Sequence, residues 1–216
     1  DPGSNPGRAI IFFILCYQKP YKHYFIYEGM QIKETTRQEV EEKSSKMSDF
    51  LKMEYLENCI KSHISLDVKK FAHVQLSDLY EKRNMFTEAA KHKASLAELT
   101  TTFKDKKNAF VQEAELWVKA ARFPEADNAV KKAMACANTI EKQEIKEIIK
   151  QIYKNQASLN LKKQKNATAL KFYEKLSSLE LIEDEKKDVR KNLLFLYDKL
   201  GKVREFYKIK KIIEDV

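Results

Sequence analysis

The sequence predicts an all-α fold, and three observations support that prediction. Glycine and proline are nearly absent after residue 30, where only Pro124 and Gly201 remain. The strong helix formers Lys, Glu, Ala and Leu are abundant in the same region. Apolar residues recur there three and four positions apart, as in Ile145, Ile148 and Ile149, a spacing that places side chains on one face of a helix. We therefore expect the chain beyond residue 30 to form helices joined by short turns.

The composition is that of one folded unit with a heavily charged surface. The chain has 216 residues, of which 43% are hydrophobic and 34% charged, so it differs from a disordered chain and has enough apolar residues to bury a core. Its formal net charge of +9 suits contact with nucleic acid, anionic lipid or an acidic protein surface. Because Lys and Glu alternate through most of the chain, the pattern favours a lysine-rich solvated surface over a separate basic block.

The cysteines, histidines and glycines do not form a familiar catalytic or metal-binding pattern. Cys16, Cys59 and Cys136 are far apart, and their odd number fits neither a disulfide framework nor a zinc site. The four histidines lack the spacing of metal ligands, and a region with so little glycine cannot hold a glycine-rich phosphate loop. We expect no metal, no cofactor and no enzymatic activity, and a reducing, cytoplasmic location.

Residues 1–29 differ in composition from the rest of the chain. They hold three of the four glycines, three of the four prolines and a strongly apolar run, Ala9–Tyr17. That run is too short to cross a bilayer, which takes roughly 20 residues, and no small-residue cleavage site of a secretory signal follows it. Gly3–Pro6 resembles the translated 3′ end of a transfer-RNA gene. We therefore expect a non-native or disordered extension, with the native start at Met30 or Met47.

The remaining sequence contains an internal repeat. Phe86–Ala89 (FTEA) is echoed 37 residues later by Phe123–Ala126 (FPEA), and a large aromatic, Tyr80 or Trp117, stands six residues before each phenylalanine. Weaker echoes follow, so that the aromatic position reads Tyr80, Trp117, Leu161 and Tyr197, and the start of the next helix reads Phe86, Phe123, Ala167 and Val203. The units are 37, 44 and 36 residues apart. This spacing predicts four helical hairpins within residues 66–216.

An aromatic near the end of one helix, followed by aromatic-x-Glu-Ala at the start of the next, resembles the tetratricopeptide repeat (TPR) family over roughly residues 67–215. The resemblance implies a right-handed stack of antiparallel helical hairpins, a TPR-like solenoid. Small residues would let the paired helices approach closely, and aromatics would fill the spaces between them. The small residues are Ser77, Ala89, Ala114, Ala126 and Ala133, and the aromatics are Tyr80, Phe86, Trp117, Phe123 and Tyr197. The third and fourth units depart from the pattern at Ala167 and Phe206.

The sequence also indicates how the helices end and how the stack begins. A left-handed backbone conformation is expected at the end of each first helix, at Asn84, Ala121, Lys165 and Gly201. Residues 30–65 are expected to form an N-terminal cap, with one amphipathic helix from Met47 to Ile64. Such a helix would cover the apolar surface that the open end of a repeat stack exposes.

The repeat pattern predicts a non-catalytic scaffold that binds another protein on the concave face made by the first helix of each hairpin. One lysine recurs per unit, and in a stacked solenoid these lysines would align and attract an acidic segment. Alternatively, each lysine only complements the negative end of its own helix. The candidate partner-binding residues are Lys82, Lys119, Lys163 and Lys199. The peptide-carboxylate clamp of the family is not expected, because Val74, Asp78, Val111 and Glu115 occupy the inner positions.

A second hypothesis is that the protein binds RNA or the ribosome. Four lysines at a spacing of four would lie on one helix face and follow a row of phosphates. These candidate phosphate contacts are Lys142, Lys146, Lys150 and Lys154. Glutamates, including Glu144 and Glu147, stand between them, and a solvated helix face explains the pattern equally well.

Overall fold

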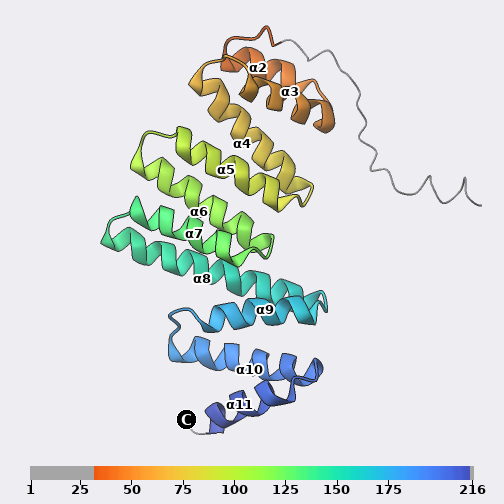
Figure 1. Cartoon of the computed structure of the whole chain (residues 1–216), viewed down its shortest axis with the longest axis vertical. Coiled ribbons are helices and arrows are strands. Elements are labelled where there is room, and N and C mark those ends of the chain that lie inside the picture. The colour runs from red at the N-terminus through yellow and green to blue at the C-terminus, as the bar shows by residue number, and fades with distance from the viewer. Residues whose placement is uncertain (1–31, 215–216) are drawn as a thin grey trace, which may run out of the picture. The chain divides into compact units, whose positions relative to one another are not determined.

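The computed structural model describes residues 32–214, and this part of the chain contains ten α-helices and no strand. The all-α prediction is confirmed. In chain order the helices are α2 (Arg37–Ser45), α3 (Asp49–Lys61), α4 (Leu66–Lys82), α5 (Phe86–Leu99), α6 (Phe103–Lys119), α7 (Phe123–Ala135), α8 (Thr139–Lys162), α9 (Asn166–Ser177), α10 (Glu183–Lys199) and α11 (Val203–Glu214). Each packs against the next helix in the chain, which fits a helical stack (Figure 1). The expected extension, residues 1–29, lies outside the described residues.

Side-chain caps explain where several helices start. Thr36, Ser65, Thr102 and Asn138 precede α2, α4, α6 and α8, and a side-chain oxygen of each accepts a hydrogen bond from the backbone N–H three residues on. Pro124 lies in the first turn of α7, where a missing N–H costs no helical hydrogen bond. Local sequence therefore sets the starts of these five helices.

Four helices, α4, α6, α8 and α10, end in the same kind of turn. In each turn one backbone N–H donates to a carbonyl five residues earlier, at 2.8 to 2.9 Å: Met85 to Tyr80, Arg122 to Trp117, Lys165 to Asn160 and Lys202 to Tyr197. The residue before each donor has a positive φ: Asn84 (58°), Ala121 (56°), Gln164 (56°) and Gly201 (66°). This is the Schellman arrangement that ends a helix with a left-handed residue.

The third of these turns corrects the predicted register by one residue. Gln164, and not Lys165, has the left-handed conformation, and α8 ends at Lys162. Lys162, and not Lys163, is therefore the equivalent of the other repeated lysines. The four helices end at Lys82, Lys119, Lys162 and Lys199, which are 37, 43 and 37 residues apart.

With the corrected register, the third unit has small residues at the same positions as the first unit. Ala157 and Ala169 are fully buried and correspond to Ser77 and Ala89 of the first unit. The Ser77 hydroxyl donates to the backbone oxygen of Ala89 at 3.1 Å, which joins α4 closely to α5. A continuous apolar cluster then runs from Ala97 to Tyr197, so most of the buried core lies between α5 and α10.

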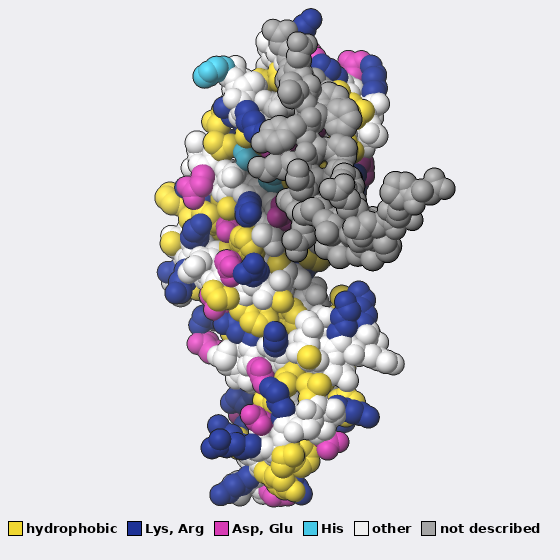
Figure 2. Space-filling model, turned by 45° about the vertical axis from the view of Figure 1, so that its right-hand side comes forward, with side chains coloured by type: hydrophobic (Ala, Val, Ile, Leu, Met, Phe, Trp, Pro, Cys, Tyr) yellow, Lys and Arg dark blue, Asp and Glu magenta, His cyan; other side chains and the backbone are white. Residues whose placement is uncertain are grey.

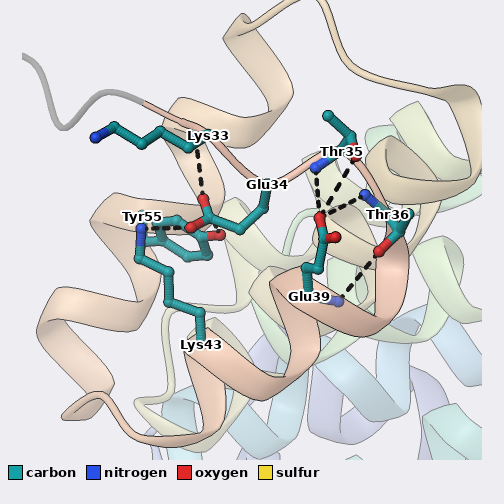
Figure 3. A network of polar contacts seen from close by, with 7 residues as sticks. All are labelled: Lys33, Glu34, Thr35, Thr36, Glu39, Lys43 and Tyr55. Carbon is teal, nitrogen blue, oxygen red and sulfur yellow. Dashed lines mark hydrogen bonds and ion pairs between the residues drawn. The ribbon is translucent and has the colours of Figure 1, made fainter.

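The N-terminal segment contains two helices, α2 and α3, where one helix from Met47 to Ile64 was expected. Val40 of α2 is fully buried. The Glu34 carboxylate accepts hydrogen bonds from the Lys43 ammonium at 2.8 Å and from the Tyr55 hydroxyl at 3.0 Å (Figure 3). Part of the core therefore lies before Met47. The helix expected within Met47–Ile64 is present as α3, and α2 was not anticipated because its polar sequence gives only a weak amphipathic pattern.

The connections between helices α4 to α11 fall on two edges. The four left-handed turns lie along the right-hand side of Figure 1, and the connections after α5, α7 and α9 lie along the left. We call the first of these the turn edge. No helix within residues 32–214 combines the length and apolar character needed to cross a bilayer.

Candidate partner-binding groove

A groove of about 580 Å³ opens on the turn edge, where the turns after α4, α6 and α8 approach one another. Its lining combines apolar, amide and charged side chains. The lining residues are Glu81, Asn84, Phe86, Lys119, Ala120, Ala121, Gln156, Leu159, Asn160, Lys163, Lys165, Thr168 and Phe172. Three successive units therefore contribute to one surface.

The groove lies where the third unit lacks its aromatic residue. The position that holds Tyr80, Trp117 and Tyr197 in the other units is occupied by Asn160. Its amide donates to the backbone oxygen of Gln156 at 2.8 Å, so this short side chain is held against its own helix. The groove therefore adjoins the one unit in which this position carries no aromatic ring.

The floor of the groove is apolar. Phe172 is buried and meets the ring of Phe123 edge-on, with centroids 5.2 Å apart. Phe86 is half-buried, and Leu159 is 41% exposed although it belongs to a helix with a well-packed opposite face. An apolar side chain of a ligand would therefore bury surface against Leu159 and Phe86 without any rearrangement of the core.

Lys119 lines the groove and is already paired. Its ammonium lies 2.7 Å from carboxylate oxygens of both Glu81 and Glu115. Burial alone would lower the pKa of Lys119, but the hydrogen bonds to Glu115 and Glu81 outweigh that effect and raise it above the ordinary value. Lys119 therefore stays charged, and it links α4 to α6 more than it attracts a ligand.

The remaining positive charge lies on the rim. Lys163 and Lys165 are exposed, and neither forms an ion pair within the described part of the chain. Lys82 and Arg83 extend the same edge beside Asn84. Because these ammonium and guanidinium groups are solvated and unpaired among the described residues, they remain available to a carboxylate or another anion.

The predicted lysine row is only partly brought together. Lys119 and Lys163 line the groove, whereas Lys82 and Lys199 do not. Lys199 belongs to α10, where its ammonium lies 6.0 Å from the centroid of the Phe195 ring. Lys163 also does not occupy the same repeat position as Lys82, Lys119 and Lys199. In the third unit that position holds Lys162. Lys163 contributes through its place in the turn.

The predicted basic stripe on α8 is divided by ion pairs. Lys146 lies 2.9 Å from Glu180, and Lys150 lies 2.7 Å from Glu147 and 3.0 Å from Glu185. The pKa of Lys150 is raised, first by its hydrogen bond to Glu147. Of the four stripe residues, Lys142 and Lys154 are exposed and lack an ion pair among the described residues. The inner half of the stripe therefore binds α8 to the α9–α10 region.

The comparisons with known proteins identify no family. No family model matches the chain, and no curated protein matches it. The functional proposal therefore rests on the geometry of the groove and its charged residues. In the described residues no group of three or more His, Cys, Asp or Glu side chains is placed to hold a metal ion.

Several groove residues were not predicted from the sequence. Gln156, Leu159 and Asn160 belong to the third unit, where a register one residue too late assigned the aromatic position to Leu161. The residue types in the turn do not fix the register either. Gln164 follows two lysines and precedes a third, and none of these residue types is preferred over the others at the left-handed position. Only the backbone hydrogen bonds decide between them.

Proposed function

We propose that this protein is a non-catalytic interaction scaffold, a TPR-like stack of four antiparallel helical hairpins, whose turn-edge groove binds an acidic segment of another protein. In this proposal the hairpins are α4–α5, α6–α7, α8–α9 and α10–α11. Four equivalent Schellman turns and buried small residues at matching positions support the repeat architecture. A stack of this kind presents extended surfaces that suit partner recognition.

The observation that carries the proposal is the groove itself. Its apolar floor, at Phe86 and Leu159, would hold aliphatic or aromatic side chains, and its amides at Gln156 and Asn160 offer donors and acceptors to a peptide backbone. Its unpaired charges, at Lys163 and Lys165, are positive. A ligand with apolar residues alternating with Asp or Glu matches all three features.

A photo-crosslinking experiment tests this proposal directly. A benzoylphenylalanine placed at Leu159 reports on the groove, and one placed at Ile148, which is similarly exposed at 46%, reports on a surface outside it. Each form is irradiated in native extract with and without nuclease, and the attached peptides are sequenced. We expect acidic protein segments at position 159, resistant to nuclease, and no comparable adduct at position 148.

Charge variants separate specific recognition from general basicity. Lys163→Glu with Lys165→Glu should abolish the adduct, whereas Lys131→Glu with Lys187→Glu, the same change at exposed sites outside the groove, should preserve it. Asn160→Tyr should fill the groove and also abolish the adduct without altering charge. Equal adducts at both probe positions, or loss of the adduct after nuclease treatment, would count against an acidic protein partner.

RNA binding is not the function that the geometry favours. A phosphate-binding stripe needs free ammonium groups, but Lys146 and Lys150 already engage Glu180, Glu147 and Glu185. Recruiting them would require these ion pairs to break, including the Lys150–Glu185 pair that joins α8 to α10. The nuclease arm of the crosslinking experiment addresses this alternative.

A further inference from the structure

The last described helix, α11, has an uncovered apolar stripe. None of its residues is buried. Val203 and Tyr207 are each 63% exposed, and Ile213 is 42% exposed. Only Phe206 and Ile209 pack partly against the main core cluster. Space-filling Figure 2 shows hydrophobic side chains at the α11 end, with Lys and Arg side chains on both sides of them.

The equivalent positions of α9 are covered. The Schellman turns place α11 in register with α9 at an offset of 37 residues, so that Tyr207, Lys210 and Ile213 correspond to Leu170, Tyr173 and Leu176. All three α9 residues are buried, and α10 packs against α9. Val203, Tyr207 and Lys210 follow one another at spacings of four and three, which makes one stripe along α11. In α9 the corresponding residues are covered by a helix, α10.

Basic residues lie beside the stripe, and Lys210 lies within it. Residues 202–214 contain Lys202, Arg204, Lys208, Lys210 and Lys211 but only Glu205 and Glu214 as acids, a net charge of +3. Arg204, Lys208 and Lys211 are exposed, and the ion pair of α11 itself joins Lys210 to Glu214 at 3.8 Å. A second copy of the same helix would bring like charges together, so an acidic occupant is favoured by charge.

We propose that α11 is a second docking site, which takes an amphipathic helix of a partner protein with acidic residues flanking its apolar stripe. The partner helix lies across α11 as α10 lies across α9. Its apolar side chains contact Val203, Tyr207 and Ile213, and its carboxylates face Lys210 and Lys211. Tyr207 is a suitable anchor because its ring packs edge-on against Phe206, with centroids 5.5 Å apart, which limits the freedom lost on binding. This site is separate from the groove.

A designed peptide pair tests the proposal. Both peptides have 17 residues and carry Val, Leu, Leu and Tyr at the spacing of Val189, Leu193, Leu196 and Tyr197 of α10. One has glutamates at the flanking positions and the other has lysines. Fluorescence anisotropy with the full chain should show the acidic peptide binding at least about tenfold more tightly, the effect of a single good interfacial anchor or charge pair. Its affinity should fall as salt is raised.

Matched variants place the binding on α11. Tyr207→Glu should weaken the acidic peptide by about tenfold or more, and circular dichroism should show an unchanged fold because the side chain is exposed. Ile140→Glu makes the same kind of change at a residue that is 74% exposed on α8, and it should leave binding unchanged. Leu159 crosslinking should persist in Tyr207→Glu, which distinguishes this site from the groove.

Three outcomes would overturn this docking site. The first is no preference for the acidic peptide over the basic one. The second is equal binding by Tyr207→Glu and the unmodified chain. The third is a Tyr207-dependent dimer in size-exclusion chromatography, or Tyr207-dependent binding to vesicles of phosphatidylcholine and phosphatidylserine, in the absence of peptide binding.

Discussion

Replacing Glu34 by Gln tests whether the segment before α2 stabilises the fold. The Glu34 carboxylate is 16% exposed and is bonded to Lys43 and Tyr55. Burial is the largest single influence and opposes ionisation. The hydrogen bonds from Lys43, from the backbone and from Tyr55, with the charge of Lys43, together outweigh it and hold the pKa of Glu34 at about 2, against an ordinary value of 4.5. The charged form is therefore favoured by folding, and Glu34→Gln removes that preference while keeping the shape of the side chain.

The size of this effect follows from the pKa difference. At about 1.4 kcal/mol per pKa unit, the difference sets an upper limit of roughly 3 kcal/mol. Because the Lys43 side chain is 37% exposed, solvent screening reduces the expected loss to about 1 to 2 kcal/mol, or roughly 2 to 8 °C in melting temperature for a chain of this size. Urea unfolding at pH 7 measures this loss.

The pH dependence gives the sign of the effect. A carboxyl group whose pKa is lower in the folded state stabilises above the unfolded pKa, near 4.5, and that stabilisation is lost as the pH falls toward 2. The difference between the unmodified chain and Glu34→Gln should therefore be largest at pH 6 to 7 and shrink toward pH 2. Glu42→Gln changes the same charge in the exposed pair with Lys46 and should have little effect. A pH-independent difference, or an equal loss in Glu42→Gln, would refute the reasoning.

The remaining predictions concern the turns, the buried His73 and α8. Ala121→Gly should stabilise the folded state by about 1 kcal/mol because Ala121 has a left-handed backbone. Gly201→Ala should destabilise it by a similar amount through backbone strain alone, since no atom lies within 4 Å of the added Cβ, and thermal unfolding measures both changes. Burial, then the neighbouring His92, lowers the pKa of His73 to about 4, so stability should fall as the pH drops from about 6.5 toward 4, and an NMR titration midpoint near 6.5 would contradict this. Lys150→Gln should cost about 1 kcal/mol and Lys142→Gln almost nothing, because only Lys150 joins α8 to Glu185; equal losses in urea unfolding would be inconsistent with a structural role.

Much of the helical architecture was predictable because it depends on local chemistry. The scarcity of Gly and Pro and the spacing of apolar residues indicate an all-α chain. Asn and Gly are also residue types that favour the left-handed conformation, and Asn84 and Gly201 occupy it. The segment before Met47 was missed for a different reason. Val40 is the buried apolar residue of a short, mostly charged helix, and its burial depends on contacts with distant residues that no local pattern records.

The candidate groove was not predictable from the repeat pattern, because it lies beside the unit that departs from that pattern. In the first, second and fourth units an aromatic five residues before the turn donor marks the register. It also contacts the preceding helix: the Tyr80 hydroxyl donates to Glu57 of α3, Trp117 packs against α5, and the Tyr197 hydroxyl donates to Glu174 of α9. In the third unit Asn160 takes that position. The residue that best indicates the register is therefore absent, and Leu161 matches the pattern instead. Asn160 lines the groove together with Leu159 and Lys119. A local departure from a repeat pattern is therefore informative, because the residue that breaks the pattern also removes packing that every other unit retains.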